Sequence, residues 1–153
     1  MDNLKSIDLL NSLLVINNER VVGYETAEQE TDQEDLKAFF SQCKYVSQEN
    51  KLGLTHEIFR LGGQPDEGRK ISGNIYRIWM DVKSALTGHD RKAILDSCNY
   101  GEEVAADTYK EVLSNGLDDI SNVQRTLLNA QLELLNANHY TVKGLIHLLQ
   151  ESN

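Results

Sequence analysis

The sequence predicts an all-α protein folded as a four-helix bundle. Long segments of the 153-residue chain place apolar residues at steps of three and four, which is the period of an amphipathic helix. The chain has a single proline, so little interrupts long helices. No segment shows a convincing strand pattern. A chain of this length fits one domain, and we expect residues 1–153 to form it.

The first half of the chain predicts two helices, of which the first covers residues 4–29. Thr31 with Glu34 matches a capping box, so the second helix is expected to begin there. Gly62 predicts the end of that helix. Residues 62–73 contain the proline and lack a periodic apolar pattern. We therefore expect a long crossover between the second and third helices.

The second half predicts two more helices. The third covers residues 72–114 and should be kinked or broken at 87–90, where Asp90 can cap the part that resumes. Asp118 or Asp119 is expected to begin the fourth helix, which continues almost to the end of the chain. Two short turns and one long crossover are typical of the ferritin-like arrangement of a four-helix bundle.

The charge balance limits the partners that the chain can have. Its formal net charge is −9, and phosphate backbones and anionic lipids attract basic proteins. We therefore expect neither nucleic acid nor a membrane as a partner. No secretory signal and no membrane span is apparent. Cys43 and Cys98 fall inside predicted helices and are interpreted as buried thiols of a cytoplasmic protein.

Two ionisable residues interrupt lines that are otherwise apolar. Glu102 lies in the third predicted helix and His139 in the fourth. Burying either group is costly unless it finds a partner. One interpretation is a buried polar pair, bonded to each other, to water, or to Tyr24, Asn17 or Asn138. The other is a metal site, because helical bundles hold metal ions with inward-facing Glu and His.

A complete di-metal site needs a Glu from each of two helices and a Glu-x-x-His pair from each of the other two. The candidate ligands are Glu25, Glu28, His56, Glu102 and His139. Three residues before His56 stands Gly53, and three before His139 stands Asn136. Neither histidine belongs to a Glu-x-x-His pair, so the ligand set is incomplete.

Short motifs occur along nearly the whole chain. They are LNSLL at 10–14, VGYETA at 22–27, LGGQP at 61–65, RIW at 77–79, LTG at 86–88, AIL at 93–95, GEE at 101–103, Tyr109 and His139. Together they resemble a family of uncharacterised bacterial ferritin-like four-helix-bundle proteins, a domain of unknown function. The resemblance implies the fold, a broad link to stress responses and a tendency to form homodimers. It also implies that this chain has lost metal ligands, because Tyr76 and Gly53 stand where the family often has His and Glu.

We therefore expect a non-enzymatic cytosolic bundle without a cofactor or catalytic residues, which acts in stress protection or as an interaction module. The alternative is a divergent iron or manganese carboxylate protein, either an oxidase or a metal store, that uses the candidate ligands above. A nucleic-acid-protecting assembly of the miniferritin kind is a third hypothesis, and the negative charge argues against it. The sequence identifies no protein partner.

Overall fold

The computed structural model describes residues 3–66, 73–116 and 118–152. Within these residues it contains five helices and no strand, which confirms the all-α prediction. The helices are α1 (Asn3–Glu30), α2 (Glu34–Arg60), α3 (Gly73–Thr87), α4 (Arg91–Asn115) and α5 (Asn122–Glu151).

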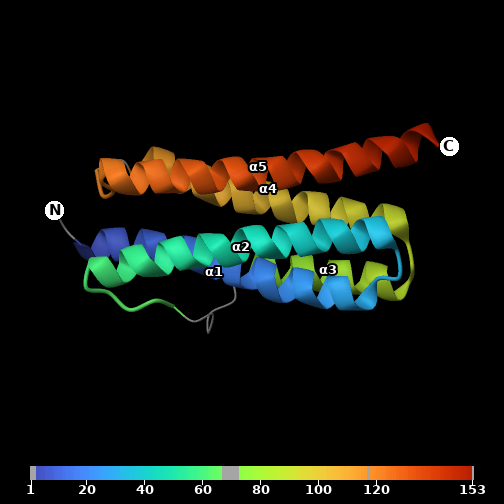
Figure 1. Cartoon of the computed structure of the whole chain (residues 1–153), viewed down its shortest axis with the longest axis horizontal. Helices are drawn as coiled ribbons and strands as arrows, with labels where there is room; N and C mark the ends of the chain where they lie inside the picture. The colour runs from blue at the N-terminus through green and yellow to red at the C-terminus, as the bar shows by residue number, and fades with distance from the viewer. Residues whose placement is uncertain (1–2, 67–72, 117, 153) are drawn as a thin grey trace.

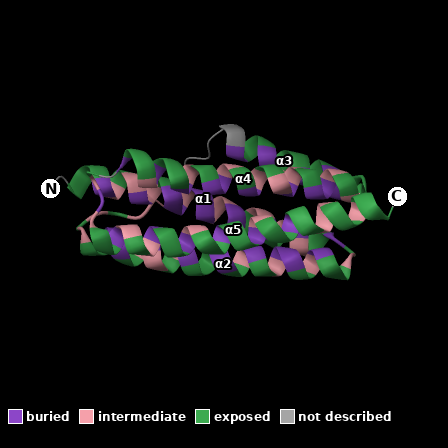
Figure 2. Cartoon of the chain, turned by 90° about the horizontal axis from the view of Figure 1, so that it is seen from above, coloured by how far each residue is buried: buried purple, intermediate pink, exposed green. Residues whose placement is uncertain are grey.

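Four long helices form two antiparallel hairpins, α1 with α2 and α4 with α5 (Figure 1). The hairpins pack on each other through α2 against α5 and α1 against α4. The shorter helix α3 contacts only α4 and α1 among the described elements. It therefore covers one side of the bundle, while α2 and α5 form the opposite side (Figure 2).

The predicted third helix is two helices that lie side by side (Figure 1). Helix α3 ends at Thr87, and His89 has a φ of 53°, in the left-handed region. The chain reverses there, and the side chain of Asp90 accepts a hydrogen bond from the backbone N–H of Ala93 at 3.1 Å to begin α4. The expected break and its cap are present, but the helix after the break does not continue the direction of α3.

The ends of the other helices agree only partly with the sequence analysis. The end of α2 agrees, because Gly62 adopts a φ of 82° and closes the helix. The prediction of a capping box at Thr31 was wrong. Gln33 is the N-cap of α2, and its side chain makes no capping hydrogen bond. Helix α5 begins with a capping box of Ser121 and Gln124, later than predicted. The predicted crossover includes residues 67–72, which lie outside the described residues.

Two apolar clusters fill the bundle at different heights along its axis. One is built around Leu10, Leu13, Leu54, Ile58 and Leu128. The other is built around Tyr24, Phe40, Leu95 and Val142. Three buried polar residues, Arg20, Glu102 and Asn138, fall between these clusters along α1, α4 and α5. The helices are therefore joined by apolar packing at both ends and by polar contacts between them.

Helix α3 is held close to the bundle by two glycines. A Cβ at Gly23 of α1 would lie 2.2 Å from the ring of Trp79, and one at Gly101 of α4 would lie 3.0 Å from Ile78 Cγ2. The missing side chains let Trp79 and Ile78 reach the helix surfaces. Trp79 also packs edge-on against Tyr24, with 4.9 Å between ring centroids.

Among the described residues, no helix combines the length and the apolar character that crossing a membrane requires.

Candidate functional site: a buried ion pair between the helices

The predicted apolar line of α4 is buried, and Glu102 lies at its centre. The line contains Leu95, Cys98, Glu102, Ala105, Tyr109 and Val112, each of them buried. Steps of three and four residues place these side chains on one face of the helix. Glu102 is only 1% exposed, so its carboxylate needs a partner within the protein.

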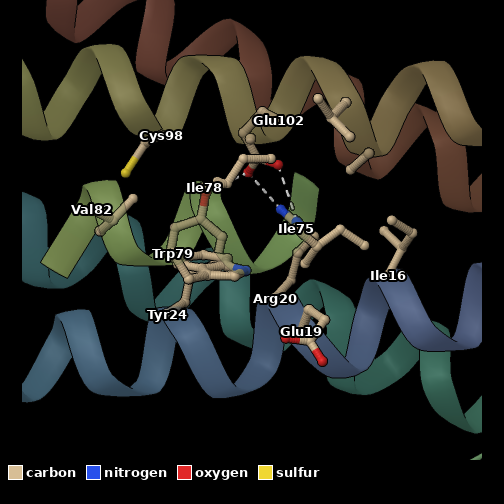
Figure 3. A pocket seen from close by; sticks show the side chains of 13 residues that line it. Ile16, Glu19, Arg20, Tyr24, Ile75, Ile78, Trp79, Val82, Cys98 and Glu102 are labelled. Atoms are coloured by element: carbon tan, nitrogen blue, oxygen red, sulfur yellow. Dashed lines mark hydrogen bonds and ion pairs between the residues drawn. The ribbon is translucent and has the colours of Figure 1, made fainter. Parts of the chain in front are cut away.

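That partner is Arg20 of α1 (Figure 3). Its Nε donates to Glu102 Oε2 at 3.0 Å, and its Nη2 donates to Glu102 Oε1 at 2.6 Å. This two-pronged geometry is the strong form of a carboxylate–guanidinium contact. The hydroxyl of Tyr24 also donates to Glu102 Oε1, at 2.9 Å, so both carboxylate oxygens are engaged.

The guanidinium of Arg20 also binds the other two long helices. Its Nη2 donates to Asn138 Oδ1 of α5 at 3.1 Å, and its Nη1 donates to Ser47 Oγ of α2. Cys43 of α2 places its Sγ 3.5 Å from Glu102 Oε1. A single ion pair is therefore in hydrogen-bond contact with side chains from all four long helices.

A second polar layer adjoins this pair. Asn17 of α1 accepts hydrogen bonds from Ser47 Oγ at 2.8 Å and from Asn50 Nδ2 at 3.2 Å. Its own Nδ2 donates to the hydroxyl of Tyr109 at 2.8 Å, and that hydroxyl donates to Gln131 Oε1 at 2.6 Å. Gln131 Nε2 donates to the backbone oxygen of Asn50 at 3.1 Å. These contacts pair most of the buried polar groups, which is what a stable core requires.

The electrostatics of the network favour a fixed ion pair over reactive groups. Burial by itself lowers the pKa of Arg20, but Glu102, together with Tyr24 and Cys43, outweighs burial, and the pKa is raised. Burial, followed by the charge of Glu102, raises the pKa of Tyr24 and of the thiols Cys43 and Cys98. The thiols and the phenol are therefore neutral at physiological pH, and none is an activated nucleophile.

A small internal space lies beside the ion pair, beneath α3 (Figure 3). It measures about 20 Å³ and is lined by Tyr24, Trp79 and Cys98 as well as by the pair itself. A space of this size holds about one water molecule. The site offers no room for an organic substrate in this conformation.

The described residues do not bring three of the five predicted metal ligands together. Glu25 on α1 and His56 on α2 are exposed. Glu28 is half-buried and forms an ion pair with Lys44 at 2.9 Å. Among the described residues, no group of three or more His, Cys, Asp or Glu side chains could hold a metal ion.

His139 and Glu102 have different partners. His139 is half-buried on α5, and its Nε2 lies 2.9 Å from Asn99 Oδ1 of α4. Burial and the neighbouring Lys143 lower the pKa of His139. Of the partners suggested for Glu102, the structure confirms Tyr24. It places His139 with Asn99 instead, because the adjacent Asn138 occupies the buried face of α5.

Arg20, which is the central cation, and Gln131 were not predicted as site residues from the sequence. A signal was available in each helix. On α1, Asn17, Arg20 and Tyr24 follow one another at steps of three and four. On α5, Gln131 and Asn138 lie seven apart and share a face with Leu128 and Leu135. Hydrophobicity alone favours the apolar neighbours of these polar residues as the core-facing positions, so the polar residues were overlooked.

Comparison with known proteins places the chain in a family without a defined function. No curated protein matches the chain. One family model, described as a domain of unknown function, matches residues 5–115, from the start of α1 to the end of α4. The matched region includes Arg20 and Glu102, and it covers more than half of the chain. The chain therefore belongs to the family of the domain of unknown function DUF2383.

Proposed function

We propose that this chain is a non-enzymatic, ferritin-like bundle of the cytosol, which acts in stress protection or as an interaction module. In this proposal, Glu102 joins the four long helices through Arg20 and does not bind a metal ion. The link to stress and the ferritin-like character rest on the family resemblance of the sequence motifs. The role of the centre rests on its geometry.

The observation that carries the proposal is the pairing of Glu102 with Arg20. A metal-binding carboxylate in a bundle needs a cation to neutralise it, and the guanidinium supplies that charge here. Arg20 and Tyr24 engage both carboxylate oxygens. A metal ion would have to displace Arg20, which is 3% exposed, and would leave a buried guanidinium without its counter-charge.

The state of the buried groups supports a non-enzymatic role. General acid–base catalysis works best with a group whose pKa lies near the operating pH. Burial moves the pKa values of Tyr24, Cys43 and Cys98 upward, away from neutrality. Buried neutral thiols also suit a reducing cytosol, where cysteines are kept reduced.

Metal analysis of the full chain tests this proposal. Protein purified from metal-replete cells, and the same protein incubated with ferrous iron, would be assayed for iron, manganese and oxygen consumption. We expect metal well below one ion per chain and no oxygen consumption above that of buffer. About two ions per chain would support the alternative of a metal-dependent oxidase or metal store.

Two variants make the test specific. If metal binds through the centre, Glu102→Gln should remove it, whereas Glu133→Gln on the exposed surface of α5 should not. Circular dichroism of each variant checks that the helices are intact. Metal that is stoichiometric in the parent chain and absent from folded Glu102→Gln would overturn the proposal.

A further inference from the structure

Helix α3 covers the buried centre but takes no part in its hydrogen bonds. It packs on α1 and α4 along one side of the bundle (Figure 2). Ile78, Trp79 and Val82 of α3 line the internal space beside the ion pair. The side chains that bind Arg20 and Glu102 come from the four long helices instead. Moving α3 would therefore uncover the centre without breaking any of these bonds.

The contacts that hold α3 on the bundle are apolar. The buried side chains among its residues 75–87 are Ile75, Ile78, Val82, Ala85 and Leu86. Within residues 76–87, the one side-chain hydrogen bond runs from Thr87 to the backbone of Lys83 in the same helix, and no ion pair reaches another helix. Apolar contacts have no fixed direction, so they can part and form again without a polar network to rebuild.

The turn after α3 has the properties of a hinge. Helix α3 ends at Thr87 and α4 begins at Arg91. Between them lie Gly88 and His89, and His89 holds the left-handed φ of 53°. Hinges consist of a few residues at the ends of elements, which absorb a large backbone change. A backbone change at these two residues would swing α3 away from α1 while α4 stays in place.

The four long helices hold one another without α3. Helices α1 and α2 pack as one hairpin, α4 and α5 pack as the other, and α2 packs on α5. Gln131 of α5 accepts a hydrogen bond from Tyr109 of α4 and donates one to the backbone of Asn50 of α2. These contacts do not depend on α3, so its movement does not require the bundle to unfold.

We propose that α3 is a hinged lid over the Arg20–Glu102 centre, which opens as a unit while the four long helices stay packed. Parts of a native protein open locally at a lower free energy than global unfolding, and they are the parts with few contacts. Glu102 is 1% exposed in the closed state, so water and small solutes reach it from this side when the lid is open. The inference goes beyond the proposed function, because it concerns access to the centre. The outcome of metal analysis does not affect it.

The two cysteines report on the lid from different sides. Cys98 of α4 lines the space beneath α3 and points toward Val82 (Figure 3). Cys43 of α2 is 0% exposed and Cys98 is 1% exposed, so both are covered in the closed state. The described residues of α2 do not contact α3. Opening of the lid therefore exposes Cys98 and leaves Cys43 covered, whereas global unfolding exposes both.

Labelling of both thiols in the full parent chain tests the lid. The folded protein would be incubated with N-ethylmaleimide, and peptide mass spectrometry would give the initial rate at each cysteine. Rates in unfolding urea correct for the intrinsic reactivity of each thiol. We expect Cys98 to react at least roughly 10-fold faster than Cys43, because a local opening is more frequent than global unfolding.

The dependence on urea separates the two routes to the thiols. The effect of urea on an opening scales with the surface that the opening exposes. Low concentrations of urea should therefore accelerate the labelling of Cys98 only slightly and that of Cys43 steeply. Equal rates at the two cysteines, or equal dependence on urea, would overturn the proposal. This comparison uses the parent chain and so does not require any variant to fold.

Two variants locate the opening at α3. Trp79→Ala removes the ring that rests on Gly23, so it should accelerate the labelling of Cys98 by roughly 10-fold or more. Tyr109→Phe is the control, because the hydrogen bonds of that hydroxyl join long helices that stay packed when the lid opens. It should leave the rate at Cys98 within about 2-fold and accelerate Cys43, which depends on global unfolding. An unchanged rate at Cys98 in folded Trp79→Ala would show that α3 is not the lid.

Discussion

The guanidinium of Arg20 and the carboxylate of Glu102 form a two-pronged ion pair between α1 and α4, with nitrogen–oxygen distances of 2.6 and 3.0 Å. The pair is buried where the two apolar clusters of the core meet. Buried ion pairs contribute little net stability, since desolvation offsets most of the attraction. We expect its main effect to be specificity, because only one register of the helices lets Asn138 and Ser47 reach the same guanidinium.

Replacing Gly23 by alanine should loosen α3. The new Cβ would lie 2.2 Å from the ring of Trp79, so the ring or the helix must move. We expect a loss of about 1–3 kcal/mol in unfolding free energy, as for an overpacked core. The protein has one tryptophan, so a shift in its fluorescence reports the displacement directly.

Gly144→Ala is the control for this prediction. Gly144 lies inside α5, and a Cβ there meets nothing within 4 Å. The change should stabilise the protein by up to about 1 kcal/mol, because alanine favours the helix, and should leave the fluorescence unchanged. Equal effects of the two substitutions would show that the contact between Trp79 and Gly23 does not hold α3.

Tyr109→Phe should destabilise the bundle by about 1–3 kcal/mol, because it leaves a buried acceptor of Gln131 without its donor. The hydroxyl of Tyr109 also accepts from Asn17, so two helices lose a contact. Urea unfolding measures the change. Tyr100→Phe, on the exposed side of α4, should stay within about 0.5 kcal/mol of the parent.

The stability of the chain should depend on pH through His139. Burial and Lys143 lower its folded pKa below the ordinary value of 6.5. Between the folded pKa and the ordinary value, the unfolded chain binds more protons than the folded chain. The contribution of His139 to stability is therefore fully present above about pH 6.5 and is lost as the pH falls through the folded pKa. The change should be modest, because much of the ring meets solvent.

His139→Gln removes the titration while keeping a donor for Asn99. Urea unfolding of both proteins at about pH 7.5 and about pH 5.5 separates this histidine from the other groups. The variant should lose less stability than the parent between the two conditions. An identical loss in both proteins would show that His139 does not contribute.

The helices could be predicted from the sequence because their signals are local. Apolar periodicity places α1, α2, α4 and α5 correctly, and Gly62 and Asp90 identify two helix ends. The reversal between α3 and α4 was missed, because a break in an apolar pattern does not specify the direction in which the chain resumes. That direction depends on the left-handed conformation of His89 and on packing against Gly23 and Gly101.

The centre of the network was harder to predict, because its polar residues occupy positions where apolar ones are expected. Glu102 was identified from the sequence, because apolar residues at steps of three and four on either side place it on the buried face of α4. On α1, Val21 is adjacent to Arg20 and is the more conventional core residue. Hydrophobicity alone therefore favours Val21 for the core and overlooks the cation that pairs with Glu102. The pairing also joins residues 82 positions apart, a relationship that periodicity within one helix does not contain.

A double-mutant cycle on Arg20 and Glu102 tests the central claim most directly. Unfolding in urea would be measured for the parent, for Arg20→Met, for Glu102→Leu and for the double variant. Each single substitution leaves a buried partner without its counter-charge, and we expect each to cost about 3–5 kcal/mol. The double variant should cost less than the sum of the two by more than about 1 kcal/mol, because both charges are gone. Costs that add to within about 0.5 kcal/mol would contradict the claim that Arg20 and Glu102 are buried as partners of each other.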